Sequence, residues 1–366
     1  MNNNKVRVIA MYLPQFHPIK ENDEYWGKGF TEWTNVGKAK PLFRGHYQPR
    51  VPADLGYYDL RLPETREAQA QMAKEAGIEG FMYWHYYFGN GKRVLDKPFK
   101  EVLESGNPDF PFCLGWANHS WTTRTWTKDR RGHKNEMIIE QLYPGEQDHI
   151  DHFYSILPAL KDERYIKINE EPIFVIYSPL TIPDVSSFML LWKRLAVENG
   201  LKGIHFIGLT SGWIENNQKV LDAGYDAIIP GNMWNAESKI KGKWRKLIES
   251  VIRKRFPEMM LDKYRYKDII KHFYTEYDKL ENAYPVILPQ WDRSPRSGRK
   301  AIIYTGSTPE LFEKHVKEAL EIIRNKPDDK KVLFLRSWNE WAEGNYVEPD
   351  LKFGKAYLDV LKKCLD

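Results

Sequence analysis

Short apolar runs alternate with longer stretches of helical spacing along most of the chain. Each run has about five to eight residues, the usual length of a β-strand. Several are apolar at successive positions, as in strands that are covered on both faces. Repeated units of strand and helix predict a parallel sheet. We interpret eight such runs as strands, at residues 6–13, 80–84, 112–116, 173–177, 205–209, 227–230, 286–289 and 332–336.

The stretches between these runs carry the start and stop signals of helices. Residues 63–76 begin with Pro63, have Glu64 and Glu67 in the first turns, and end before Gly77, which matches the residue preferences of helix ends. Further helices are predicted at residues 146–160, 185–198, 309–324 and 355–365. Alternating elements of this number predict an α/β fold, with a single (β/α)8 TIM barrel over residues 1–366.

An open, doubly wound sheet is the alternative arrangement of the same elements. Such sheets usually follow the first strand with a Gly-x-Gly-x-x-Gly turn that binds a dinucleotide. Here residues 12–17 read Tyr-Leu-Pro-Gln-Phe-His. No Asp-x-Asp metal motif ends a strand in the middle of the chain, and Asp328 and Asp329 precede the eighth strand. The sequence therefore favours the closed barrel and predicts neither a cofactor nor a metal ion.

Two connections are much longer than the others. They span residues 14–62 after the first strand and about 231–284 after the sixth, where we expect an insertion in the barrel. Loops that follow barrel strands lie on the face that bears the active site. The first long loop is therefore expected to cover a pocket.

The second long connection contains a basic amphipathic stretch at residues 239–256. Apolar residues recur there at helical spacing, and eight lysines and arginines surround them. One interpretation is a helix whose apolar face packs on the barrel and whose charged face is solvated. The other is a helix that rests on the anionic surface of the inner membrane, in keeping with a lipid-linked sugar substrate.

Charge and cysteine content narrow the setting of the protein. The net charge of +5 arises from 55 basic and 50 acidic residues, an excess too small to indicate nucleic acid as a partner. No segment approaches the roughly 18 consecutive apolar residues of a membrane span, and no cleavage site of a signal peptide follows residues 6–13. Cys113 and Cys364 match neither a disulfide framework nor a zinc motif. These features predict a cytoplasmic location.

Aromatic residues point to a class of ligand. They make up 14% of the chain, with 13 Trp and 21 Tyr, and many stand beside polar residues at strand ends, as in residues 83–88 and 116–121. Amphipathic rings beside amides and imidazoles suit sugars, which present an apolar C–H face and a polar hydroxyl edge. Nucleic-acid bases use similar stacking but also require a basic stripe. The composition therefore favours a sugar ligand.

Two carboxylates directly after the final strand are the strongest chemical signal. Residues 335–344 read Leu-Arg-Ser-Trp-Asn-Glu-Trp-Ala-Glu-Gly, and the C-terminal end of a barrel strand is where catalytic groups lie. Cleavage of a glycosidic bond requires two nearby carboxyl groups. Glu340 and Glu343 stand three apart, a spacing that points both side chains into one pocket. The indoles of Trp338 and Trp341 are expected to raise the pKa of one carboxyl.

Other polar and aromatic residues near predicted strand ends are candidate sugar contacts. His85 follows the second strand, Asn118 and His119 the third, and Asn232 the sixth. Glu348 is either an acceptor for sugar hydroxyls or the N-terminal partner of the next helix. The full set of predicted substrate contacts is Tyr12, Glu32, Trp33, His85, Trp116, Asn118, His119, Asn232, Gln290, Trp291, Asp292, Trp338, Asn339, Trp341 and Glu348.

Several of these motifs resemble a known family. Residues 338–349 resemble the signature at the same strand end in glycoside hydrolase family 99. The chain as a whole resembles the glycosyltransferase WbsX family, a group similar to family 99 that is found in O-antigen and capsule gene clusters. That resemblance covers nearly all of the chain and includes residues 12–17, 26–33, 116–119 and 289–292.

The resemblance implies roles for the two glutamates. In family 99 the residue matching Glu340 removes the proton of the sugar 2-hydroxyl, which gives a 1,2-anhydro intermediate. The residue matching Glu343 acts as general acid and then as base, so the reaction proceeds with net retention. Ala342 differs from family 99, which usually has His at this position.

We therefore predict an enzyme that acts on glycosidic bonds with retention, by glycosyl transfer in the synthesis of bacterial O-antigen or capsule polysaccharide. Its predicted substrate is an oligosaccharide or a lipid-linked sugar. One alternative is an endo-acting mannoside hydrolase or transglycosylase. A second is a barrel that binds glycans without catalysis, and Ala342 favours this alternative.

Overall fold

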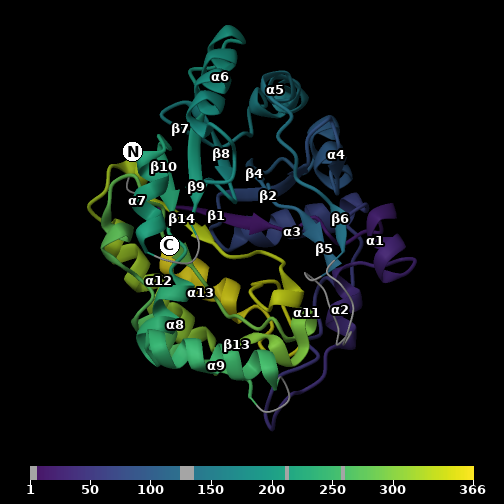
Figure 1. Ribbon diagram of the computed structural model, residues 1–366, viewed down its shortest axis with the longest axis vertical. Coiled ribbons are helices and arrows are strands. Elements are labelled where there is room, and N and C mark those ends of the chain that lie inside the picture. The colour runs from purple at the N-terminus through teal and green to yellow at the C-terminus, as the bar shows by residue number, and fades with distance from the viewer. Residues whose placement is uncertain (1–5, 124–135, 211–213, 257–259) are drawn as a thin grey trace.

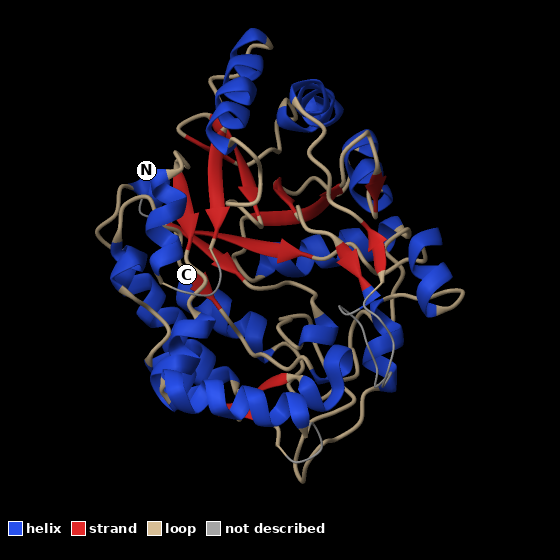
Figure 2. Ribbon diagram, in the orientation of Figure 1, coloured by secondary structure: helices blue, strands red, loops and turns tan. Residues whose placement is uncertain are grey.

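The computed structural model describes residues 6–123, 136–210, 214–256 and 260–366, apart from the side chains of residues 243, 253 and 254. Among these residues, eight parallel strands form the central sheet in the order β10-β9-β8-β4-β2-β1-β14-β12 (Figures 1 and 2). Their bounds are β1 Arg7–Tyr12, β2 Gly80–Tyr87, β4 Phe112–Trp116, β8 Glu171–Ile176, β9 His205–Leu209, β10 Ala227–Ile229, β12 Val286–Ile287 and β14 Val332–Leu335. All eight predicted strands are confirmed, with differences at their ends.

The sheet curls into a nearly closed barrel. Its first and last strands, β10 and β12, are joined through the residues just before β12. There the Ile228 N–H donates to the carbonyl of Asn282 at 2.9 Å, and the Tyr284 N–H donates to that of Ile228 at 2.8 Å. These two bonds extend the ladder around the ring, so the predicted TIM barrel is confirmed in preference to an open sheet.

Helices cover the outside of the barrel (Figure 2). The five predicted helices are present as α3 Pro63–Glu75, α5 Glu146–Leu160, α6 Val185–Glu198, α12 Pro309–Ile323 and α13 Ala356–Leu365. Pro63 starts α3 at a position where its missing N–H costs nothing, and Gly77 follows the helix with φ 79°. Two helices without a sequence prediction, α4 Lys97–Ser105 and α7 Glu215–Asp222, complete the outer layer on their sides.

The first long connection carries two short helices, α1 Lys20–Trp26 and α2 Glu32–Lys38. The second carries α8 Met233–Lys241, α9 Lys243–Arg255, β11 Asp262–Arg265, α10 Tyr266–Lys271 and a 3-10 turn, η2 Glu276–Lys279. Gly242 separates α8 from α9 with φ 74°, a conformation that strains residues with a side chain. Strand β11 pairs in parallel with β13 Ile302–Thr305, which lies outside the barrel.

Smaller elements extend single strands of the barrel. β3 Arg93–Val94 pairs with β2, and β7 Lys167–Ile168 pairs with β8, both antiparallel. β5 Trp121–Thr122 and β6 Met137–Ile139 form a separate antiparallel pair. The short turn-like helices are α11 Ser294–Ser297, η3 Gly298–Lys300, η4 Asp328–Lys330 and η5 Trp341–Glu343.

Gly115, which has no side chain, makes room for larger neighbours inside the barrel. A Cβ atom at Gly115 in β4 would lie 3.0 Å from the methyl carbon of Met82 and 3.1 Å from the ring of Trp84. The glycine therefore lets these two larger residues of β2 fill the space beside it. Because Trp84 also borders the cavity described below, this packing helps to shape that cavity.

The basic stretch does not pack as the first sequence interpretation expects. Trp244, Leu247, Ile248 and Val251 of α9 are exposed, whereas Lys246 and Glu249 are buried. The prediction that the apolar face of this helix packs on the barrel is therefore wrong for these four residues, because ion pairs hold the opposite face. No helix among the described residues combines the length and the apolar character needed to cross a membrane.

Candidate active site

A cavity of about 250 Å³ lies at the C-terminal ends of the barrel strands. Its walls come from the ends of β1, β2, β4 and β8 and from the segments that follow β12 and β14. This is the end of the barrel at which TIM-barrel enzymes carry their active sites. The lining residues are Met11, Leu13, Gln15, Trp84, Tyr86, Ala117, His119, Trp121, Tyr177, Arg293, Arg296, Arg336, Glu340 and Glu343.

Glu340 and Glu343 meet at one guanidinium nitrogen. Arg296 Nη1 lies 2.6 Å from Oε1 of Glu343 and 3.4 Å from Oε1 of Glu340. The shared nitrogen limits the separation of these two oxygens to about 6 Å, whereas carboxyl groups of inverting glycosidases stand about 6.5–9.5 Å apart. The two carboxyl groups therefore lie close together at the cavity wall.

The two carboxyls differ in their preferred protonation. Burial raises the pKa of Glu340, and the neighbouring charge of Glu343 adds to this effect. Burial acts in the same direction on Glu343, but the guanidiniums of Arg293, Arg296 and Arg336 outweigh it and lower the pKa of Glu343 to about 2. These surroundings therefore hold Glu343 as a carboxylate and favour a proton on Glu340.

A third carboxyl lies against the same arginine, behind the other two. Glu32 is the first residue of α2 and is fully buried. Its Oε1 accepts from Arg296 Nη2 at 2.9 Å and from the Ala342 N–H at 3.2 Å. Burial raises the pKa of Glu32 to about 7, although Arg296 opposes this. Glu32 thus ties the first long loop to the carboxylate loop and positions Arg296, and it does not border the cavity.

The loop that carries Glu343 is fixed by its contact with the segment after β12. The Asp292 N–H donates to the carbonyl of Glu343 at 2.8 Å. Gly344 has φ 63°, and a Cβ atom there would lie 2.9 Å from the backbone of Asp292. The Asp292 side chain accepts from His46 Nε2 at 2.8 Å and Gln48 Nε2 at 2.7 Å. Although burial opposes it, the His46 hydrogen bond together with Arg50 lowers the pKa of Asp292 to about 2.

Glu340 is oriented from its other side by two residues of its own loop. Its Oε2 accepts from Ser337 Oγ and from Asn345 Nδ2, both at 3.3 Å. Asn345 is fully buried, and its amide also donates to Ser337 Oγ at 3.3 Å. These contacts leave Glu340 partly exposed at the cavity wall, with 14% of its side chain accessible.

A buried polar network beneath the cavity contains several of the predicted contacts. Glu348 accepts from Tyr58 Oη at 2.9 Å, Gln69 Nε2 at 2.6 Å and Trp341 Nε1 at 2.6 Å. Burial raises the pKa of Glu348 to about 7, and these donors oppose the shift. Asn339 exchanges two hydrogen bonds with the backbone of Leu13, at 2.8 and 3.0 Å. The network joins the ends of β1 and β14.

The aromatic members of the same region are also internal. Tyr12 donates to Gln69 Oε1 at 2.6 Å, and Trp33 donates through Nε1 to the carbonyl of Tyr58 at 2.7 Å. Trp341 stacks on Tyr346 with ring centroids 3.7 Å apart, and Trp338 packs against Phe81 at 5.2 Å. None of the predicted contacts Tyr12, Trp33, Trp338 and Trp341 borders the cavity.

The remaining predicted contacts divide by position. His119 borders the cavity, where burial lowers its pKa to about 4. The others lie outside the cavity wall and bond to protein: His85 to His152, Trp116 to the carbonyl of Tyr87, Asn118 to Ser178, Asn232 to Asp278, Gln290 to Arg50, and Trp291 beneath Arg336. His85 lies within β2 rather than after it, because the strand continues to Tyr87. That prediction of its position is wrong.

Sequence reasoning missed most of the cavity wall. Arg293 directly precedes the four-residue helix α11, which follows β12, and Arg296 lies within it. In the sequence, the only sign of a shared role was their spacing of three around Pro295. Tyr86, Tyr177 and Arg336 stand at or near predicted strand ends, and this position was the signal that could have identified them, whereas Trp121 lies farther from the predicted third strand. Whether such a side chain points into the barrel depends on its register in the strand. An error of one residue in the predicted register reverses that direction.

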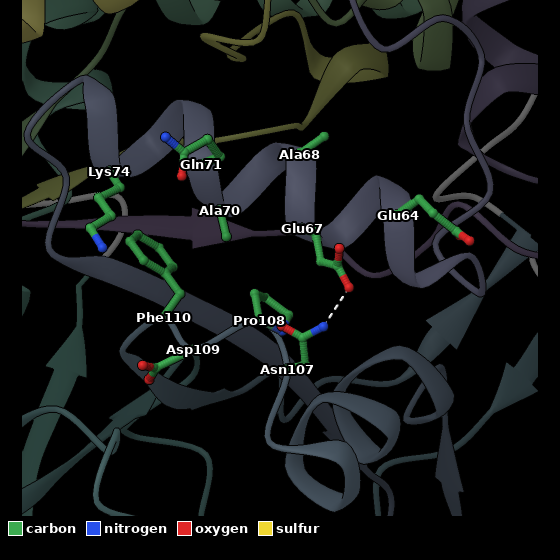
Figure 3. A pocket seen from close by; sticks show the side chains of 10 residues that line it. All are labelled: Glu64, Glu67, Ala68, Ala70, Gln71, Lys74, Asn107, Pro108, Asp109 and Phe110. Carbon is green, nitrogen blue, oxygen red and sulfur yellow. Dashed lines mark hydrogen bonds between the residues drawn. The ribbon is translucent and has the colours of Figure 1, made fainter.

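A larger hollow, of about 490 Å³, lies between α3 and residues 107–110. Figure 3 shows Glu64, Glu67 and Lys74 along α3, with Asn107 bonded to Glu67. Residues 107–110 precede β4, so this hollow is toward the N-terminal ends of the strands, where TIM barrels do not place their active sites. We therefore assign the site to the smaller cavity. Among the described residues no group of three or more His, Cys, Asp or Glu is placed to hold a metal ion.

Solved structures with the same fold are known. A glycoside hydrolase-like protein superposes with a TM-score of 0.61 at 14% identity, covering 100% of this chain and 95% of its own. An endo-α-mannosidase of glycoside hydrolase family 99 from Bacteroides thetaiotaomicron, in complex with bis-tris propane, gives 0.58 at 15% identity, covering 98% and 96%. At these identities the likeness establishes the fold.

Sequence relatives are closer. Two proteins named WxcX, both described as uncharacterized, from strain B100 and a second strain of Xanthomonas campestris pv. campestris, are each 33% identical over 361 residues. The alignments cover 98% of this chain and 49% of each relative, so the chain spans about half the length of the curated relatives it matches. The model of the family described as glycosyltransferase WbsX matches residues 8–361, and with this extent of agreement the chain belongs to that family.

Proposed function

We propose that the protein is a carbohydrate-active enzyme that acts on glycosidic bonds with retention, by glycosyl transfer, with Glu340 and Glu343 as its catalytic carboxylates. One observation carries this proposal: the two carboxyls border one cavity and share Arg296 Nη1 at 2.6 and 3.4 Å. Retaining reactions use two carboxyls at such close range.

The different pKa values of Glu340 and Glu343 support different roles for the two carboxyls in the reaction. Glycosidic cleavage needs one carboxyl that gives a proton to the leaving oxygen and one that is ionised. Because the pKa of Glu340 is raised and that of Glu343 is about 2, we assign the proton donor to Glu340 and the anionic role to Glu343. This is the reverse of the roles implied by the resemblance to family 99, in which the residue matching Glu343 is the acid.

Aromatic residues of the cavity wall fit the sugar that the carboxyls would act on. Trp84, Tyr86, Trp121 and Tyr177 border the cavity together with His119. Trp84 packs edge-on against Tyr177 with ring centroids 5.6 Å apart, which leaves ring surface for the apolar face of a sugar. We assign substrate contacts to these five residues rather than to those buried in the hydrogen-bond network below.

The biological setting of the reaction is proposed from the family. The description of the family as glycosyltransferase WbsX favours glycosyl transfer, and we propose that this transfer serves the synthesis of O-antigen or capsule polysaccharide. We propose an oligosaccharide or lipid-linked sugar as substrate and the cytoplasm as the location. An endo-acting mannoside hydrolase or transglycosylase is the second candidate, favoured by the common fold with the family 99 endo-α-mannosidase.

A two-armed assay tests the proposal and separates these candidates from glycan binding without catalysis. The protein is incubated with nucleotide sugars and a lipid-linked acceptor, and separately with mannan-type oligosaccharides. Turnover in the first arm supports transfer, and turnover in the second supports hydrolysis. The Glu340→Gln and Glu343→Gln variants should lose turnover in the active arm. Binding of oligosaccharide without turnover in either arm would instead assign a lectin-like role to the barrel.

A further inference from the structure

Helix α9 is oriented against the rule for helices on the surface of water-soluble proteins. Its apolar residues point outward: the exposed fractions are 80% for Trp244, 57% for Leu247, 58% for Ile248 and 62% for Val251. Their spacing of three and four places them on a single stripe, which we call the α9 stripe. Contiguous apolar surface of this kind marks a site of interaction.

The opposite side of α9 is held to the protein by charges. Lys246 is buried, forms an ion pair with Glu237 of α8 and lies 3.2 Å from the ring centroid of Trp234. Glu249 is buried as well and accepts from Lys241 at 2.7 Å. Because these pairs fix the rotation of the helix, the α9 stripe faces solvent as a consequence of how α9 is attached.

Among the side chains that the structure describes, the exposed charged residues of α8 and α9 are all basic. The acidic residues within α8 and α9, Glu237 and Glu249, are both buried in ion pairs. Lys239, Arg245 and Arg255 are exposed, and Arg245 pairs with Glu249 at 2.9 Å. An exposed apolar stripe with an interfacial tryptophan and flanking cations is the pattern of helices that lie in the headgroup region of anionic membranes.

We propose that the α9 stripe binds the surface of an anionic lipid bilayer. The cations would lie at the level of the lipid headgroups while Trp244, Leu247, Ile248 and Val251 enter the acyl boundary. The arrows of β8 and β9 run toward the side of the molecule on which α8 and α9 lie (Figure 2). Binding would therefore bring the catalytic end of the barrel near the membrane. The proposal is independent of the reaction, because none of the cavity-lining residues belongs to α9.

Co-sedimentation with vesicles tests this proposal. We expect the protein to bind vesicles of phosphatidylglycerol and phosphatidylethanolamine in equal parts, and to bind phosphatidylcholine vesicles at least about tenfold less. The double substitution Leu247→Ser with Val251→Ser should reduce binding about tenfold or more. The matched control is Leu190→Ser with Val197→Ser on α6, where the side chains are 69% and 60% exposed, and it should bind like the wild type.

A second measurement does not depend on the stability of the double variant. Brominated lipid should quench part of the tryptophan fluorescence, and Trp244→Phe, which keeps an apolar ring, should bind vesicles but lose that part of the quenching. Equal binding by the α9 and α6 double variants would overturn the proposal. So would a wild-type dimer that ignores vesicles and that the α9 substitutions convert to monomer, because the stripe would then contact a second copy.

A separate observation concerns the charge inside the cavity. Three arginines border it, against two glutamates of which Glu340 favours the protonated form. Arg296 and Arg293 both contact Glu343, at 2.6 and 3.1 Å. The guanidinium of Arg336 lies 5.2 Å from the ring centroid of Trp291 and has no hydrogen bond or ion pair with any residue that the structure describes, while its backbone N–H donates to the carbonyl of Ile287.

Excess cations are unfavourable for a reaction that develops positive charge at the anomeric carbon, unless the substrate itself brings negative charge. Guanidinium groups are well suited to bind phosphate and carboxylate groups. We infer that the substrate carries an anionic group, a phosphate or a sugar carboxylate, which binds Arg336 with help from Arg293. This inference rests on the proposed function, because it concerns the substrate of the same cavity.

Calorimetric titration distinguishes the two sources of negative charge. Inorganic pyrophosphate represents a phosphate-activated donor, methyl glucuronide represents an acidic sugar, and methyl mannoside is the neutral control. We expect one of the two anions to bind, Arg336→Gln to weaken it about tenfold or more, and Arg336→Lys to restore part of the affinity. Arg194→Gln, an exposed arginine on α6, should have no effect.

The test separates this inference from the catalytic proposal. Glu340→Gln should keep anion binding even though it removes turnover. Equal affinity of the wild type and Arg336→Gln for both anions would overturn the inference, as would binding of methyl mannoside alone. Turnover that survives Glu340→Gln while Arg336→Gln still loses anion binding would instead contradict the catalytic proposal and leave the anion site in place.

Discussion

Arg296 donates from Nη1 to Oε1 of Glu343 at 2.6 Å, inside a site where both side chains are nearly inaccessible to water. The same guanidinium also reaches Glu32 and Glu340. One arginine thus contacts three carboxyls, which come from α2 and from the loop after β14. Without it, burial and mutual repulsion would drive protons onto these groups.

Replacing Arg296 with methionine should therefore cost stability as well as activity. Loss of one partner from a buried ion pair costs about 3–5 kcal/mol, and urea denaturation at neutral pH measures it. The pKa of Glu343 is about 2 in the folded protein against an ordinary 4.5, so its stabilising effect is present above pH 4.5 and is lost as the pH falls toward 2. The difference between wild type and variant should shrink in acid.

The control for that experiment is Arg194→Met on α6, whose side chain is 63% exposed and lies 3.8 Å from Glu198. Exposed pairs of this kind contribute about 0–1 kcal/mol. A variant at Arg296 that is no less stable than this control would contradict a neutralising role for Arg296.

Gly344→Ala should damage the carboxylate loop through the backbone. The residue has φ 63°, and its new Cβ would lie 2.9 Å from the backbone of Asp292. Gly354→Ala is the matched comparison, since it has φ 53° and no atom within 4 Å of the added carbon. The left-handed conformation alone costs about 1–2 kcal/mol, so thermal unfolding should show a clearly greater loss at Gly344. Equal losses of stability would contradict this prediction, because they would mean that Asp292 moves away from the added Cβ at no cost.

Because the pKa of Glu348 is raised and that of Glu343 is lowered, the two residues should make stability depend on pH in opposite directions. The pKa of Glu348 is raised to about 7 in the folded protein from an ordinary 4.5, so the folded state binds more protons between these values. Stability contributed by this group is present below pH 4.5 and declines as the pH rises to about 7, by on the order of 3 kcal/mol. Denaturation curves of the wild type and Glu348→Gln at several pH values should show that this decline is reduced in the variant.

Substitutions at Trp84 and Trp338 should have different effects, the first on substrate binding and the second on stability. Trp84 borders the cavity, whereas Trp338 is fully buried against Phe81. Trp84→Ala should raise KM about tenfold or more, because a stacking surface is lost. Trp338→Phe should leave KM within a few-fold and reduce stability by about 1–3 kcal/mol. The reverse pattern, with KM sensitive only to Trp338, would contradict the placement of the sugar platform.

The barrel itself was predictable because its signal is local. Residues 206–209, for example, form an apolar run between His205 and Thr210, and with His205 they are β9 in the structure. The carboxylate loop was found for a similar reason, since Glu340 and Glu343 directly follow an apolar run that ends the series of strands. Periodicity and position along the chain suffice for features of this kind.

The partners of these carboxyls were not predictable in the same way. Arg296 reaches them from a four-residue helix after another strand, and Glu32 reaches Arg296 from a loop 264 residues earlier in the chain. Glu348 was expected to accept from sugar hydroxyls or to partner the N-terminus of the next helix, and it is instead buried with three hydrogen-bond donors from the protein. The orientation of α9 was likewise decided by Lys246 and Glu237, residues whose pairing depends on the bend at Gly242. Such contacts are set by tertiary structure.

The most direct test of the account follows the stereochemistry and the leaving-group dependence of the two glutamine variants. Proton NMR of the first product formed by the wild type should show the anomeric configuration of the donor. Glu340→Gln should lose turnover of a natural donor by about a thousandfold or more and regain much of it with a glycosyl fluoride, which departs without a proton. Glu343→Gln should be inactive with both donors. Inversion of configuration, or full activity in both variants, would contradict the assignment of Glu340 and Glu343 as the catalytic pair.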